Sequence, residues 1–180
     1  PRLGEFDARQ LANVAWALSK FPESAGEKVF DCIADEVASR GSLDAFTSQG
    51  LAMLALAFGT VGHASNGELW DGLEKAVVAR SSELGPIECS QIAWSFAKVE
   101  RRSEDAFDAI QRTAMAKMGS IQPQGLSNLA WAFATVGRGD PHFFETIARE
   151  SLQKLDAFTP HDKVVLVLAF AQIDAPHPEI

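Results

Sequence analysis

The feature that most constrains this 180-residue chain is a helical sequence pattern that occurs five times along it. Its clearest copy runs from Ile121 to Gly137. Apolar residues follow one another there at spacings of three and four: Leu126, Leu129, Phe133 and Val136. This spacing predicts a helix with one apolar face. Pro123 suits the first turn and Gly137 suits the end of that helix.

The other four copies align with this one on Trp131. The same position is occupied by Trp16, Leu56, Trp94 and Leu168, at steps of 40, 38, 37 and 37 residues. A second apolar marker lies ten residues earlier in every copy: Phe6, Phe46, Leu84, Ile121 and Phe158. Two markers in the same register over five copies indicate stacked supersecondary units. We call the helix that carries both markers the A helix.

A second amphipathic pattern, the B helix, lies between successive A helices. Its aromatic markers are Phe30, Trp70, Phe107 and Phe144. Apolar residues follow three, seven or eight positions later, as on one face of a helix. An acidic residue comes directly after each marker: Asp31, Asp71, Asp108 and Glu145. We interpret the charged face of the B helix as solvated.

The fold class that follows is all-α, an α-solenoid of stacked two-helix repeats with a period of about 37–40 residues. One repeat domain spans residues 1–180, a fragment of a longer repeat protein by our interpretation. Its repeats cover about 1–45, 46–83, 84–120, 121–157 and a partial 158–180. Copy five is the most apolar, which suits either a terminal cap or a helix whose partner follows.

Helix starts carry capping signals. Asp7 with Gln10 predicts a capping box for the first A helix, and Thr159 before Pro160 predicts a cap for the last. For the B helices the predicted caps are Ser24 with Glu27, Ser65 with Glu68, and Asp140 before Pro141.

Charge is divided unequally between the two kinds of helix. The net charge is −8. The A-helix segments (6–21, 46–61, 84–99, 121–136 and 158–173) hold four bases and three acids, so the remainder carries −9. The overall acidity argues against a general nucleic-acid binder, but the A helices are nearly neutral.

The motif around Trp131 resembles the octotricopeptide repeat. It is similar also to the helical repeats of RAP-domain organellar RNA-binding proteins. The matching residues are Pro123, Gln124, Leu126, Asn128, Leu129, Trp131 and Ala132, with Gln49, Leu51, Leu54, Asn13, Trp16 and Trp94 in other copies. Leu56 and Leu168 depart from the motif. The resemblance implies binding of organellar RNA, and a role in the stability, processing or translation of particular transcripts.

A polar face of the A helix lies opposite its apolar stripe. Positions seven and three before the Trp position and four after it are mostly amides, hydroxyls and bases, with no carboxylate. Such side chains contact base edges and phosphates. The candidate RNA-binding residues are Arg9, Asn13, Lys20, Gln49, Thr60, Gln91, Lys98, Gln124, Asn128, Thr135, His161 and Gln172. The alternative interpretation of these residues is a solvated face.

The tryptophans lie at the edge of this polar face. Trp16, Trp94 and Trp131 suit either stacking on bases or filling the seam between successive A helices. Leucine at the same position in two copies favours the seam.

Nothing in the sequence indicates an enzyme. It contains no nucleophile motif, no phosphate-binding glycine loop and no metal-ligand spacing. We therefore expect no catalytic residue, metal or cofactor. His63, His142, His161 and His177 are interpreted as surface residues, and Cys32 and Cys89 as buried free thiols.

Two functions stay open. One is a single-stranded RNA-binding protein of a plastid or mitochondrion, a location implied by the resemblance. The other is a protein-binding scaffold or structural subunit of a large organellar assembly such as a ribosome or photosynthetic complex. Protein partners are expected in either case. No apolar run is long enough for a membrane span.

Overall fold

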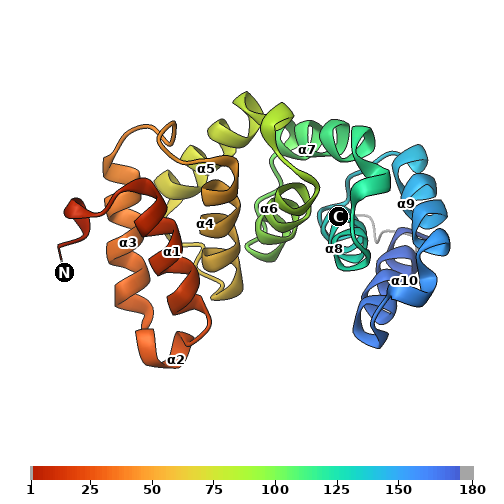
Figure 1. Cartoon of the computed structure of the whole chain (residues 1–180), viewed down its shortest axis with the longest axis horizontal. Coiled ribbons are helices and arrows are strands. Elements are labelled where there is room, and N and C mark those ends of the chain that lie inside the picture. The colour runs from red at the N-terminus through yellow and green to blue at the C-terminus, as the bar shows by residue number, and fades with distance from the viewer. Residues whose placement is uncertain (1, 175–180) are drawn as a thin grey trace, which may run out of the picture.

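The computed structural model describes residues 2–174 as an all-α solenoid, which confirms the predicted fold class (Figure 1). The A helices are α1 (Ala8–Ser19), α4 (Ser48–Thr60), α6 (Pro86–Lys98), α8 (Pro123–Val136) and α10 (Pro160–Asp174). The B helices are α3 (Glu27–Ser39), α5 (Gly67–Ala79), α7 (Glu104–Ala116) and α9 (Pro141–Gln153). A short helix that the sequence pattern did not indicate, α2 (Pro22–Ala25), joins α1 to α3. The described residues contain no strand.

The helices form an arc of two layers (Figure 1). The A helices lie along its inner, concave side and the B helices along its outer rim. Each A helix packs extensively against the next A helix, whereas successive B helices contact one another much less. The inner layer is therefore close-packed and the outer layer is spread apart, which gives the solenoid its curvature.

Small side chains allow the A helices to approach closely. The residues one and four positions before the Trp position are small and buried in the first four copies: Ala12, Ala15, Ala52, Ala55, Ser90, Ala93, Ser127 and Ala130. The closest approach is at Gly59 of α4, where an added Cβ would lie 2.9 Å from Cα of Ser95 in α6. These seams require small residues, because a larger side chain would push neighbouring A helices apart.

The core lies between the two layers. The apolar stripe of α8 (Leu126, Leu129, Phe133 and Val136) is buried, as predicted. Each B-helix marker contacts an aromatic ring of the next A helix edge to face. The ring pairs are Phe30–Phe58 (5.7 Å), Trp70–Phe96 (5.7 Å), Phe107–Phe133 (5.0 Å) and Phe144–Phe170 (6.2 Å). One repeated contact therefore joins every repeat to the next.

Hydrogen bonds join the end of each B helix to the start of the A helix in the same repeat. A 3₁₀ turn follows most B helices, at Ser81–Glu83, Met118–Ser120 and Leu155–Ala157, and another, Leu3–Glu5, precedes α1. A base ten residues after the B marker donates to the carbonyl oxygen of the A-helix marker. The pairs are Arg40–Phe6 (2.7 Å), Arg80–Phe46 (2.8 Å), Lys117–Leu84 and Lys154–Ile121 (2.7 Å).

Charged pairs also join neighbouring repeats. The residue seven positions after the Trp position reaches the preceding B helix in three copies: His63 to Asp31 (2.8 Å), Arg101 to Asp71, and Arg138 to Glu104 (2.9 Å). The hydrogen bond from Arg138 lowers the pKa of Glu104 below its ordinary value. These three acids are exposed, as predicted for the charged B face, and each also contacts the next repeat. His63 was predicted at the surface, but its ring is buried between two repeats.

Four of the six predicted helix starts agree with the structure. The capping box of Asp7 with Gln10 forms, Asp140 and Thr159 cap α9 and α10, and Pro123 begins α8. The other two are wrong. Asn66, not Ser65, caps α5 by accepting a hydrogen bond from the backbone of Leu69. Gly26, with a φ of 72°, precedes α3 because α2 occupies the residues before it.

Successive A helices begin at Ala8, Ser48, Pro86, Pro123 and Pro160, so their starts are 40, 38, 37 and 37 residues apart. The final residues of the partial fifth repeat, 175–180, lie outside the described residues, as does the surface prediction for His177. Among the helices that the structure describes, none has the length and apolar character of a membrane span.

Candidate RNA interface on the concave side

The candidate residues lie on the A helices, on the concave side of the arc. None of the twelve is buried. Gln91, Asn128 and Thr135 are half-buried and the other nine are exposed. The A helices line the concave side of the arc (Figure 1). Since the apolar stripe of α8 is buried, we infer that its opposite face, with Gln124 and Asn128, is directed to that side.

Two hollows open between neighbouring A helices at equivalent places. One lies between α1 and α4 and has a volume of about 260 Å³. Arg9, Asn13 and Gln49 line it. The other, also about 260 Å³, lies between α6 and α8. Gln91, Gln124 and Asn128 line this second hollow. The structure thus brings six of the twelve candidates together in two groups of three.

A glycine lies in the wall of each hollow. Gly50 and Gly125 are both six positions before the Trp position. A Cβ on Gly125 would lie 2.8 Å from Cγ2 of Ile121 and 3.3 Å from Oγ of Ser90. At Gly50 the nearest atoms would be 3.5 Å away, in ordinary contact. Glu88 and Asp162 hold the same position in copies three and five.

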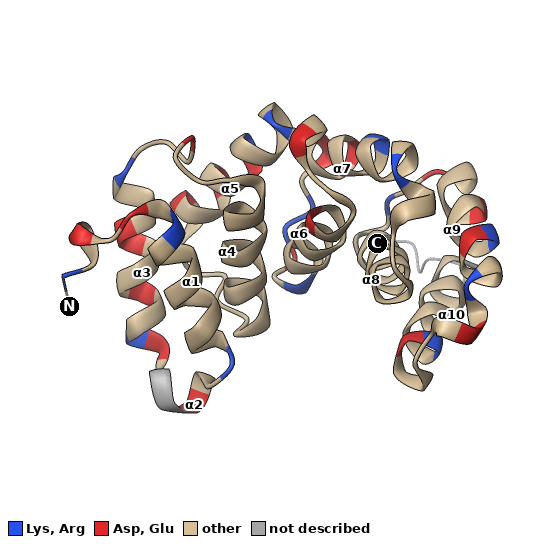
Figure 2. Ribbon diagram, in the orientation of Figure 1, with Lys and Arg blue, Asp and Glu red and all other residues tan. Residues whose placement is uncertain are grey.

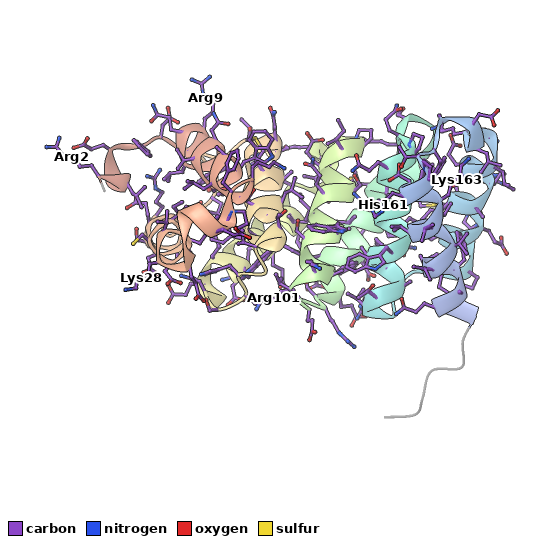
Figure 3. All side chains as sticks on the ribbon, turned by 90° about the horizontal axis from the view of Figure 1, so that it is seen from below. Arg2, Arg9, Lys28, Arg101, His161 and Lys163 are labelled. Atoms are coloured by element: carbon purple, nitrogen blue, oxygen red, sulfur yellow. The ribbon has the colours of Figure 1, made fainter. Side chains whose placement is uncertain are left out.

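The remaining candidates line neither hollow. Four of them come late in their A helices, and Lys20 directly follows α1: the four are Thr60, Lys98, Thr135 and Gln172. Both hollows lie near the helix starts. His161 lies in α10, at the opposite end of the molecule from Arg9 (Figure 3). These residues extend the polar face along the helices without forming a concave site with the others.

Some lining residues were missed by the sequence interpretation. Thr47 lines the first hollow, and Gln122 and Ser90 line the second. Their signal is the repeat register itself, because Thr47 and Gln122 are both nine positions before the Trp position. That position precedes the helix, so a count of helix faces does not place it on the polar side.

The structure places two of the tryptophans in a seam and leaves the third exposed. The rings of Trp94 and Trp131 are half-buried and lie 6.2 Å apart, tilted by 38°. They therefore fill the seam between α6 and α8. Trp16 is 40% exposed, and Nζ of Lys20 lies 4.9 Å from the centre of its ring. Trp16 therefore has an open ring area on which a flat group can stack.

The electrostatics of the two layers differ (Figure 2). Lys, Arg, Asp and Glu are absent from α4 and α8, while each B helix has several of them. Three of the four A-helix bases, Arg9, Lys20 and Lys98, belong to the polar face. No carboxylate lines either hollow. The acidity of the chain is thus concentrated on the outer rim, away from the candidate interface.

The residues described by the structure include no group of three or more His, Cys, Asp or Glu side chains arranged to hold a metal ion. Cys32 is exposed, which contradicts its predicted burial, and Cys89 is buried in α6. Both are free thiols.

No protein-family model matches the chain, and no curated protein matches its sequence.

Proposed function

We propose that this chain binds single-stranded RNA along its concave side and acts in the stability, processing or translation of organellar transcripts. One observation carries the proposal: two equivalent hollows, each lined by amide side chains and free of carboxylates, open between A helices. Amide groups recognise base edges by paired hydrogen bonds. Helical-repeat RNA-binding proteins read one base per repeat with two or three side chains. The resemblance to the octotricopeptide repeat supports the same function and a location in a plastid or mitochondrion.

In this proposal each of the two hollows holds one nucleotide. The base enters the hollow and meets the amides, while Arg9, Lys20 and Lys98 contact phosphates. With about three phosphates neutralised, the logarithm of the affinity should fall with the logarithm of the salt concentration at a slope of about −2. This weak dependence, together with the net charge of −8, predicts modest affinity and a contribution from hydrogen bonds.

The test is a fluorescence anisotropy titration of the chain with a pool of short randomised RNAs at several salt concentrations. Gln124→Ala should relax the preference at one nucleotide and leave the fold intact, because Gln124 is exposed in the second hollow. The matched control is Gln153→Ala, which removes an exposed amide from α9 on the outer rim. Equal effects of the two variants, or no binding at low salt, would contradict the proposal.

A second candidate function is a protein-binding scaffold in a large organellar assembly. The small number of bases on the concave side favours it, as does the exposure of Ile87 there, at 59%. Ile87 lines the second hollow beside the amides. If RNA fails to bind while Ile87→Asp abolishes capture of a protein from organelle extract, the scaffold function takes precedence.

A further inference from the structure

The end of the solenoid formed by α9 and α10 exposes a continuous group of apolar side chains. The exposed fractions are 71% for Leu152, 45% for Leu155, 58% for Val164, 66% for Val167 and 61% for Leu168. A groove of about 290 Å³ lies between the two helices. Leu152 and Leu155 line one side, and Leu166, Val167 and Phe170 line the other. Exposed apolar surface gathered in a groove is typical of an interaction site.

Equivalent grooves earlier in the chain are each filled by a B helix. The helix α5 packs against α3 and α4, α7 packs against α5 and α6, and α9 packs against α7 and α8. The contact is clearest at Phe133 of α8. Phe107 lies 5.0 Å from it on one side, and Phe143 of α9 covers it at 4.6 Å. The groove between α9 and α10 therefore continues an established series of helix-binding grooves.

Phe170 is placed in α10 as Phe133 is placed in α8. Both are two positions after the Trp position, and Phe144 contacts Phe170 as Phe107 contacts Phe133. Within residues 2–174, however, no aromatic ring corresponding to Phe143 covers Phe170, which is half-buried. We propose that the groove between α9 and α10 binds one amphipathic helix in the position of a further B helix. This proposal does not depend on RNA binding.

The occupant is not another A helix. Val164 and Val167 stand where the first four A helices have buried alanine or serine. Those small residues permit the close approach of successive A helices, and two valines prevent it at the same distance. The stripe that suits the groove is that of the B helices, with an aromatic residue followed three and seven positions later by apolar ones.

The repeat register also specifies one polar residue of the occupant. In α3, α5, α7 and α9 the base ten positions after the aromatic marker donates to the carbonyl oxygen of the A-helix marker. The corresponding marker of the fifth copy is Phe158. The occupant therefore carries a base ten positions after its aromatic marker, as the four B helices do.

The experiment titrates the chain with fluorescein-labelled 15-residue peptides and measures fluorescence anisotropy. The probe has the sequence of residues 140–154. It should bind about threefold more tightly than the same peptide with Lys154→Met, as expected for the loss of one hydrogen bond. A third peptide with Phe144→Ser and Ile147→Ser should not bind.

Variants of the chain locate the site. Val167→Asp should weaken binding of the probe by about tenfold or more, because it places a charge in an apolar groove. Val167 is exposed, so the variant should fold normally. The control is Val78→Asp, at an exposed valine of α5, which should bind as the unmodified chain does.

Three results would overturn the proposal. They are absence of probe binding, binding that Val167→Asp leaves unchanged, and tighter binding of the Lys154→Met peptide than of the probe. Light scattering of the chain alone tests a second copy as the occupant. Self-association that Val167→Asp abolishes, without binding of the probe, would assign the groove to a dimer interface and overturn the helix proposal as well.

Discussion

At the scale of single residues, the recurring device is a base that ends a B helix and donates to a backbone carbonyl. Lys154 is the most complete case, since its Nζ lies 2.8 Å from the carbonyl oxygen of Gly119 and 2.7 Å from that of Ile121. These carbonyls belong to the turn before an A helix, where helical hydrogen bonds are not available. The base therefore completes the hydrogen bonding of a turn and fixes one helix of the repeat to the other.

Lys154→Met should lower the free energy of unfolding by about 1.5 kcal/mol, because hydrogen bonds from a charged donor are lost while the aliphatic volume is kept. Urea denaturation followed by circular dichroism measures the change. Lys75→Met is the control, since Lys75 is an exposed lysine of α5. If the two variants lose equal stability, the contact of Lys154 with the two carbonyls contributes nothing measurable.

At the scale of helices, the seams between A helices decide the architecture. Gly59 illustrates the requirement. Every residue except proline has a higher helix propensity than glycine, but the seam at Gly59 has no room for a side chain. Gly59→Ala should therefore destabilise the chain by about 1–3 kcal/mol through overpacking, less the roughly 1 kcal/mol that alanine gains in helix propensity.

Gly67→Ala provides the comparison. Gly67 begins α5, and no atom lies within 4 Å of the place where its Cβ would be. This variant should be neutral or slightly stabilising in the same denaturation measurement. A stabilising effect of Gly59→Ala would show that α4 and α6 separate easily, contrary to the close packing of the inner layer.

The sequence predicted the helices well because their apolar stripes repeat in five copies. It failed where a contact crosses between repeats. The burial of His63 depends on Asp31, which is 32 residues away, and no local pattern records that pair. Among the repeats that the structure describes, the short helix α2 occurs in one, so the period gives no information about it. Glycines also line the hollows, Gly50 the first and Gly125 the second, and a list of polar residues does not include them.

At the scale of the whole molecule, each repeat contacts mainly its neighbours. Stability is then close to a sum of repeat and interface contributions. Deleting residues 1–45 should leave a folded helical chain with lower stability. Its denaturant m-value should fall by roughly a quarter, since m follows the surface exposed on unfolding. Complete loss of helical circular dichroism on this deletion would instead indicate one indivisible core.

The contrast between the close inner layer and the open outer layer has a mechanical consequence. When a layered body bends, the layer that resists stretching keeps its length. Here that layer is the row of A helices, which alanines and a glycine allow to pack closely. Bending of the solenoid would then change the distances between successive B helices. The distance between the two hollows on the concave side would stay nearly constant while the curvature changes. An extended strand bound there, as proposed, would therefore meet the hollows at a fixed spacing.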